Sequence, residues 1–186
     1  MAQIAAFIDF QGTLGGNGVD DIRTLALYPH SAQAIKQLND SGILAIGVTN
    51  QSHIAKGELT MAEYESCLQQ LKDELQQGGA HFDAVYCCPH DRRDVCSCKK
   101  PKSGLIDLAR NDFDIDIHHS YVIGDMGMND MVLARNIGAK AILVLTGVGQ
   151  GSMNEFRHTW QGIEPDCIAA DLLEAVKYIL TQRPME

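Results

Sequence analysis

Short apolar segments alternate with longer helical patterns along this chain of 186 residues, and that order constrains its fold more than any other feature. Apolar runs of strand length are followed by segments with the periodicity of amphipathic helices. The predicted strands are Ile4–Asp9, Ile43–Thr49, Phe82–Cys87, Tyr121–Gly124, Ala141–Leu145 and Cys167–Ala169. The predicted helices are Ser31–Asn39, Thr60–Gln77, Ser103–Asn111, Asp130–Ile137 and Asp171–Leu180. This order predicts one α/β domain over residues 1–186, a Rossmann-like three-layer α/β/α sandwich with a mostly parallel sheet.

Several helix ends carry recognisable capping residues. Thr60 is followed three residues later by Glu63, which is the spacing of a capping box. Asp171 is the expected N-cap of the last helix, and Gly138 ends the helix before it. These residues indicate helix boundaries that periodicity alone leaves open.

The composition argues against several classes of partner. The net charge of -9 and the pI of about 5.1 oppose binding to nucleic acid or to an anionic membrane, because both need a basic face. No apolar run approaches the roughly 20 residues of a membrane span. The first residues lack a basic segment and a cleavage site, so we expect no signal peptide and a cytoplasmic protein. A small anionic substrate stays compatible with this charge if a few basic residues converge on one pocket.

A cysteine-rich segment follows the third predicted strand. Four residues of metal-ligating type lie within eleven positions, and they are Cys88, His90, Cys96 and Cys98. Three thiolates and one imidazole form a closed tetrahedral zinc site, which leaves no position for water and is therefore structural. Such a site would fix the loop at 88–98 and the direction of Lys99 and Lys100. The alternative is a chance cluster of buried cysteines and a surface histidine, but cysteines in a chain without a signal peptide favour metal binding over disulfides.

Polar residues stand after the first four predicted strands, where ligands bind in parallel α/β sheets. The four segments are Phe7-Ile-Asp9-Phe-Gln11-Gly-Thr13-Leu, Val48-Thr49-Asn50-Gln51-Ser52, Lys99-Lys100-Pro101 and Val122-Ile-Gly124-Asp125-Met-Gly-Met-Asn129-Asp130. Any one acid at a strand end is explained equally well as a helix cap. All four segments in this order on one sheet form a much more specific pattern.

With these motifs the chain resembles the haloacid dehalogenase (HAD) superfamily from about Ile4 to Gly149. The pattern Cys-x-His…Cys-x-Cys, followed by a basic residue and Lys-Pro, resembles the zinc-containing phosphatases of that superfamily that lack a cap domain. That branch includes heptose bisphosphate phosphatases and histidinol-phosphatase domains. The resemblance therefore implies a phosphatase without a cap domain.

The resemblance also implies roles for individual residues. Asp9 would be the nucleophile whose carboxylate attacks phosphorus and forms an aspartyl-phosphate. Thr49 would bind the phosphoryl oxygens, and Lys100 would neutralise the charge that develops on them. The residues that would contact the substrate are Thr13, Asn50 and Lys99. Lys99 stands where heptose enzymes often carry arginine. This difference weakens the inference that this chain acts on the same substrate as those enzymes.

A magnesium site is implied by the same resemblance. The Asp9 carboxylate, the backbone carbonyl of Gln11 and Asp125 would hold Mg²⁺, with water and substrate phosphate completing an octahedron of oxygen ligands. Asp130 is placed in the same metal site, where it would orient the waters or the lysine.

One position departs from the family pattern Asp-x-Asp-Gly-Thr, whose second aspartate is the general acid and base. This chain has Gln11 there, and an amide can neither protonate a leaving alkoxide nor deprotonate water. General acid–base catalysis contributes about 10²–10⁴ in rate. Three explanations stay open: an introduced inactivating substitution, a natural enzyme that is slow or specialised, and a protein that binds phosphorylated ligands without turnover. Because Asp9, Lys100, Asp125 and Asp130 are all present, we favour retained phosphoryl transfer, with leaving groups that depart easily.

The sequence therefore predicts a monomeric, Mg²⁺-dependent phosphatase of a small phosphorylated metabolite, with structural Zn²⁺. A sugar phosphate or bisphosphate is favoured over histidinol phosphate. The alternative is a catalytically disabled HAD-like protein that binds phosphate or has a regulatory role.

Overall fold

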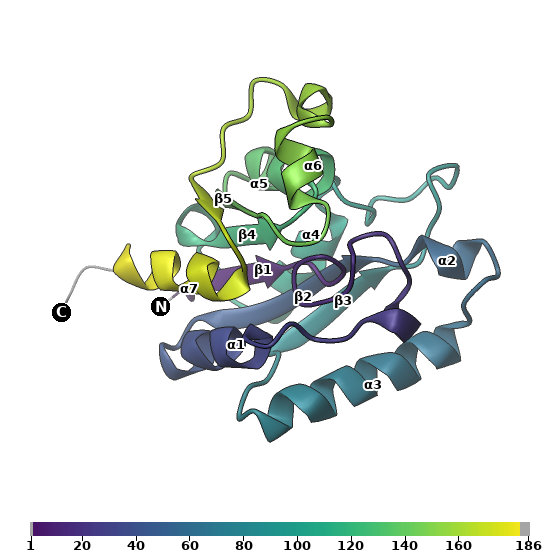
Figure 1. Ribbon diagram of the computed structural model, residues 1–186, viewed down its shortest axis with the longest axis horizontal. Helices are drawn as coiled ribbons and strands as arrows, with labels where there is room; N and C mark the ends of the chain where they lie inside the picture. The colour runs from purple at the N-terminus through teal and green to yellow at the C-terminus, as the bar shows by residue number, and fades with distance from the viewer. Residues whose placement is uncertain (1, 183–186) are drawn as a thin grey trace.

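Six parallel strands form one sheet at the centre of the computed structural model, which describes residues 2–182 (Figure 1). The strands are β1 (Ala5–Ile8), β2 (Leu44–Asn50), β3 (Ala84–Cys88), β4 (Tyr121–Gly124), β5 (Lys140–Val144) and β6 (Cys167–Ala169). Their spatial order is β3-β2-β1-β4-β5-β6, and every neighbouring pair is parallel. The order of strands along the chain reverses between β1 and β4, which is the switch point where ligands bind in such sheets.

Helices cover both faces of this sheet, which confirms the predicted three-layer α/β/α sandwich (Figure 1). The helices are α1 (Ser31–Asp40), α2 (Ser52–Ala55), α3 (Met61–Gln77), α4 (Gly104–Asp112), α5 (Val132–Ile137), α6 (Gly149–Met153) and α7 (Leu172–Thr181). Helices α1, α3 and α7 pack against Ile8 and its neighbours, whereas α4 and α5 pack against Phe7 and its neighbours. Phe7 and Ile8 serve opposite faces because successive side chains of a strand alternate.

Several short helical turns lie outside the predicted helices. They are Ile22–Thr24, Ile117–His119, the π-helical turn Gly127–Met131 and Arg157–Trp160. The π-helical turn runs directly into α5, so helical structure begins at Gly127 and not at the predicted Asp130. Segments of three to five residues carry too little periodicity to be recognised in a sequence, which also explains why α2 and α6 were not predicted. No helix in the described part of the chain is long and apolar enough to cross a membrane.

The predicted helix caps are confirmed. The Thr60 hydroxyl accepts a hydrogen bond from the Glu63 amide at 3.2 Å, and the Glu63 carboxylate accepts one from the Thr60 amide at 2.7 Å. Asp171 accepts a hydrogen bond from the Glu174 amide at 2.9 Å at the start of α7. Gly138 ends α5 with a φ of 77°, a left-handed conformation that glycine adopts without strain.

Two aspartates attach the loops that lead into β3 and β6 to the neighbouring strands by hydrogen bonds. The Asp83 carboxylate accepts a hydrogen bond from the amide of Ala45 at 2.8 Å, and the Asp83 amide donates to the Ala45 carbonyl at 2.9 Å. Asp166 makes the same pair of contacts with Ala141, at 2.7 and 2.8 Å. Both alanines are buried, so each carboxylate satisfies an amide that water cannot reach.

We expect Asp83→Ala and Asp166→Ala each to lower the free energy of unfolding by about 1–3 kcal/mol, because the buried amide of Ala45 or Ala141 then lacks an acceptor. Chemical denaturation measures this change. Asp73→Ala is the matched control, since Asp73 is exposed on α3 and its loss should cost less than about 0.5 kcal/mol. Equal losses in the control and in either variant would show that these contacts do not stabilise the sheet.

Candidate active site and metal-binding loop

The loops at the carboxyl ends of β1, β2, β3 and β4 surround a cavity of about 390 Å³ at one edge of the sheet. The loop after β1 and helix α2 lie at the same end of the molecule (Figure 1). The cavity lining includes Asp9, Gln11, Asn50, Lys99 and Lys100, all of which were predicted as site residues. The switch point of the sheet therefore brings together residues from all four motifs, because Met126 and Asn129 of the fourth also line the cavity and Asp125 lies beside Asp9.

Lys100 lies at the centre of the site, between two carboxylates. Its Nζ is 2.7 Å from Asp9 Oδ1 and 2.8 Å from Asp130 Oδ1, and its side chain is only 2% exposed. Burial alone would lower the pKa of Lys100, but the carboxylates of Asp130 and Asp9 outweigh this and raise that pKa above its ordinary value. Lys100 is therefore a fixed positive charge beside the predicted nucleophile.

Two residues that were predicted to bind substrate also position the lysine loop. The Asn50 side-chain amide donates to the Lys100 carbonyl at 3.2 Å and accepts from the Lys100 amide at 3.0 Å. The Nζ of Lys99 donates to the Ser52 hydroxyl and, at 3.1 Å, to the His90 carbonyl. Both Asn50 and Lys99 line the cavity, and their contact with substrate stays a prediction. The sequence did not suggest their second role, which is to position the loop that carries Lys100.

Asp125 has the features of a metal ligand. Its Oδ2 accepts a hydrogen bond from the Val148 amide at 2.8 Å, whereas its Oδ1 is buried and has no hydrogen-bond partner. Carboxylate oxygens of Asp9, Asp125 and Asp130 lie within 4.8 Å of one another. Burial, and then the carboxylates of Asp9 and Asp130, raise the pKa of Asp125 to about 8. A hard divalent cation would satisfy the unpaired oxygen and reduce this repulsion, so these oxygen donors fit Mg²⁺.

Asp130 differs from Asp125 because both of its oxygens are used by the protein. Oδ1 accepts from Lys100, and Oδ2 accepts from the Met126 amide at 3.1 Å. Burial raises the pKa of Asp130 to about 6, although the Lys100 charge opposes that rise. A Cβ atom on Gly124 would lie 2.2 Å from the Asp130 carboxylate, so only glycine fits there. These contacts favour the role of orienting the lysine over direct contact with the metal.

Two residues that no sequence pattern singled out hold the end of β4. The Ser152 hydroxyl donates to the Asp125 carbonyl at 2.7 Å and accepts from the Gly127 amide at 3.2 Å. The indole Nε1 of Trp160 donates to the Ser152 carbonyl at 3.0 Å, and a Cβ on Gly127 would lie 2.3 Å from that indole. The one available signal was that Trp160 is the only tryptophan of the chain.

Gln11 is part of a hydrogen-bonded chain of side chains. Its Oε1 accepts from Nε2 of Gln51 at 3.2 Å, and the same Nε2 donates to the Thr49 hydroxyl at 2.9 Å. Gln51 is buried, and no role was predicted for it from the sequence. Thr49 and Thr13 are fully buried, and their contact with a phosphoryl group stays a prediction.

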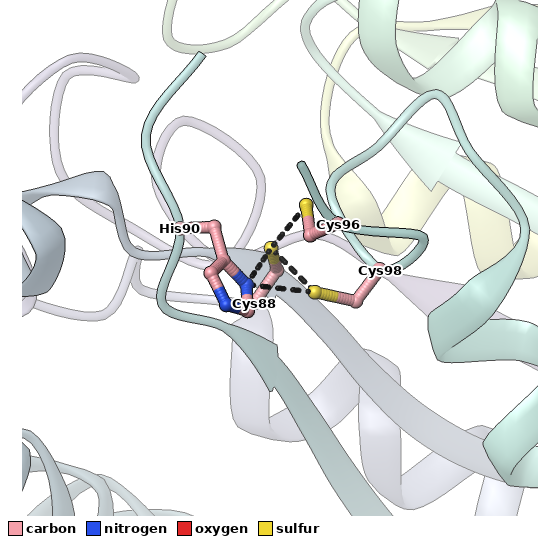
Figure 2. A group of neighbouring side chains, drawn as sticks. All are labelled: Cys88, His90, Cys96 and Cys98. Atoms are coloured by element: carbon pink, nitrogen blue, oxygen red, sulfur yellow. Dashed lines mark hydrogen bonds between the residues drawn. The ribbon is translucent and has the colours of Figure 1, made fainter. Parts of the chain in front are cut away.

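The four predicted zinc ligands lie together in the loop after β3, with their ligating atoms within 4.8 Å of one another (Figure 2). Cys88 Sγ is 3.6 Å from His90 Nδ1 and 4.0 Å from Cys96 Sγ. A tetrahedron with Zn–S bonds of about 2.3 Å has S–S edges of about 3.8 Å. Cys98 Sγ lies closer, at 2.8 Å from Cys88 Sγ, so it would move outward by about 1 Å to complete a tetrahedron. The set fits a closed, structural zinc site.

Backbone hydrogen bonds connect this loop to the end of β2. The Gln51 amide donates to the Cys88 carbonyl at 2.8 Å, and the Ala55 amide donates to the Pro89 carbonyl at 3.1 Å. Cys87 packs on the opposite face of the sheet from Cys88, as alternation along the strand predicts. The geometry of the metal-binding loop is therefore coupled to the segment that carries Thr49 to Gln51.

Comparison with known proteins identifies similar phosphatases. The family model Hydrolase_like, described as HAD-hyrolase-like, matches residues 97–175. The D-glycero-D-manno-heptose-1,7-bisphosphate 7-phosphatase of Thermosynechococcus vestitus is 33% identical over 195 residues, which cover 97% of this chain and 97% of that protein. The D-glycero-beta-D-manno-heptose-1,7-bisphosphate 7-phosphatase of Escherichia coli strain K12 is 34% identical over 77% of this chain and 80% of its own length.

A solved structure agrees with these relatives. The D,D-heptose 1.7-bisphosphate phosphatase from B. bronchiseptica, complexed with magnesium and phosphate, superposes with a TM-score of 0.86. It is 27% identical in sequence, and the match covers 97% of this chain and 100% of that one. The chain therefore belongs to the haloacid dehalogenase-like phosphatases, a family of phosphoric monoester hydrolases, in the branch of the heptose bisphosphate phosphatases.

Proposed function

We propose that this protein is a Mg²⁺-dependent phosphatase of a sugar bisphosphate that acts through an aspartyl-phosphate on Asp9. The observation that carries this proposal is the buried cluster in which Lys100 contacts both Asp9 and Asp130, with the unpaired Asp125 oxygen beside it. The complete set matches what in-line attack on phosphorus requires: a carboxylate nucleophile, a positive charge and oxygen ligands for a metal.

The residues divide the reaction between them. An Asp9 oxygen attacks phosphorus while the bond from phosphorus to the ester oxygen breaks, and water then releases phosphate and restores the carboxylate. Lys100 orients Asp9 before attack and offsets negative charge on the phosphoryl oxygens. Asp9, the Gln11 carbonyl and Asp125 would hold Mg²⁺, which supplies further charge neutralisation when bound.

The charged residues at the cavity rim support the proposal that the substrate is a sugar with a second phosphate. The exposed Lys56 and Arg92 line the cavity at its rim and offer positive charge in addition to that of Lys100, whereas Asp20 and Asp91 line it with carboxylates. Cations suit a second phosphate, and carboxylates suit sugar hydroxyl groups as hydrogen-bond acceptors. We propose that these loops of a single domain, in place of a cap domain, provide the specificity.

Phosphate release from a sugar bisphosphate should require Mg²⁺ and should fall by about 10³-fold or more in Asp9→Asn, because the nucleophile is then lost. Lys100→Met should lower kcat by about 10²–10³-fold. Lys36→Met, at an exposed position of α1, is the control and should keep full activity. If the folded protein bound phosphate but released none from any ester, the disabled, phosphate-binding alternative would be correct.

The metal loop predicts about one zinc per chain in the purified protein, measured by elemental analysis. Cys98→Ser should lose that zinc and lower the melting temperature by about 5–10 °C, because structural zinc contributes to folding free energy. Cys87→Ser is the matched control, since Cys87 neighbours Cys88 but packs on the other face. Zinc-free protein with an unchanged melting temperature would contradict the site.

The rim predicts that Arg92→Ala raises KM for a sugar bisphosphate by about tenfold, which corresponds to about 1.4 kcal/mol of lost binding. Its KM for an aryl monophosphate should stay unchanged, because that substrate has no second phosphate. Arg93→Ala is the control, since Arg93 is 90% exposed and is not among the residues that line the cavity. An equal effect of Arg92→Ala on both substrates would rule out a second phosphate site at the rim.

A further inference from the structure

We infer that Gln11 donates a hydrogen bond to the leaving-group oxygen and that Gln51 holds the Gln11 amide in the orientation required. The enzyme would then favour phosphate esters whose alcohol departs as an anion. On a sugar bisphosphate this selects the anomeric phosphate, because the anomeric hydroxyl is the most acidic of the sugar. The inference rests on the proposed phosphatase function, and it differs from the relatives, which are named for removal of the 7-phosphate.

The first step is the direction of the Gln11 amide. Gln11 lines the cavity together with Asp9, so it borders the space that a substrate would occupy. Its Oε1 accepts a hydrogen bond from Gln51 and is therefore directed toward that residue. The Nε2 group, at the other end of the amide, is left as a donor for a group in the cavity.

The second step is what fixes this direction. Thr49 has one hydroxyl hydrogen, and the family role of this residue uses it on a phosphoryl oxygen. The Thr49 oxygen can then take part in a further hydrogen bond only as an acceptor, and Nε2 of Gln51 donates to it at 2.9 Å. The second hydrogen of that Nε2 is directed to Gln11 Oε1 at 3.2 Å. The orientation of Gln11 thus follows from the requirement at Thr49.

The third step is that Gln51 is itself held in place. Its side chain is buried and its backbone amide donates to the Cys88 carbonyl at 2.8 Å. Its Oε1 is buried with no hydrogen-bond partner, which is a cost of the observed orientation. If the Gln51 side-chain amide were reversed, its NH₂ group would be buried without a partner in place of Oε1. The interaction with Thr49 and Gln11 therefore decides which orientation is kept.

The chemistry that follows differs from general acid catalysis. When Asp9 attacks, the electron pair of the breaking bond from phosphorus goes to the ester oxygen. An aspartic acid at position 11 would transfer a proton to that oxygen in the same step, whereas the Gln11 amide keeps its proton and only donates a hydrogen bond. The leaving group departs as an anion and takes a proton from water afterwards. Its basicity therefore controls the rate of this step.

The test measures kcat/KM for a series of esters from nitrophenyl through phenyl to alkyl phosphates, with Mg²⁺ present. The unmodified protein should show a steep fall in rate as the leaving group becomes more basic. Gln11→Asp should flatten this dependence and raise the rate on alkyl phosphates by about 10²–10⁴-fold. Gln11→Ala should lower the rate on nitrophenyl phosphate by about 10²–10³-fold, as expected for the loss of one donor to an anionic oxygen.

Gln51 is tested as a positioning residue. Gln51→Met should lower kcat about tenfold and steepen the dependence on the leaving group, because a free Gln11 amide stabilises the departing oxygen less well. The same substitution in the Gln11→Ala background should not change the slope, since Gln51 acts through Gln11. A Gln51→Met effect of equal size on every ester would reduce Gln51 to a structural role.

Product analysis with a hexose 1,6-bisphosphate tests the choice between two phosphates in one molecule. The unmodified protein should release the anomeric phosphate, and Gln11→Asp should lose this preference, both visible by phosphorus NMR. Release of the primary phosphate by the unmodified protein, or equal slopes for the unmodified protein and both Gln11 variants, would overturn the inference while leaving the phosphatase proposal intact. Absence of Mg²⁺-dependent turnover of every ester would refute the proposed function itself. The Gln11 variants decide the question even if Gln51→Met does not fold.

Discussion

The contact of Lys100 with Asp9 and Asp130 is the interaction on which the rest of the site depends. A lysine whose side chain is 2% exposed has lost its hydration, and only two carboxylates at 2.7 and 2.8 Å keep its charge in place. Removing one partner of such a buried group is far more costly than removing a surface ion pair. Each strand end that contributes to the site is therefore constrained in position by the others.

The loops show how the protein meets that constraint. The Asn50 side chain forms hydrogen bonds with both the amide and the carbonyl of Lys100. The Gly127–Met131 turn places Asp130 within reach of the Lys100 side chain. Behind the turn, the Ser152 hydroxyl bridges the Asp125 carbonyl and the Gly127 amide. These contacts come from segments far apart in the chain, so the precision of the site comes from the fold and not from any one motif.

The sequence predicts the parts of this structure that local patterns encode. The strands and the capped helices, such as the one that begins at Thr60, have periodicity or capping residues that can be recognised directly. The resemblance to a family identified Asp9, Lys100 and Asp125 as a group, and they lie together. Ser152 and Gln51 could not be found in this way, because their roles depend on hydrogen bonds to residues far away in the sequence. Ser152 contacts Asp125, and Gln51 contacts Gln11.

The replacement at position 11 also changes the electrostatics of the site. Three carboxylates already face one ammonium group here, and their repulsion contributes to the raised pKa of Asp125. A fourth carboxylate at position 11 would add to that repulsion. A neutral amide avoids this cost and still provides a hydrogen-bond donor at position 11. On the proposed function, Gln11 would give up acid–base catalysis and lower the repulsion among the carboxylates, an exchange between activity and stability that is common at catalytic centres.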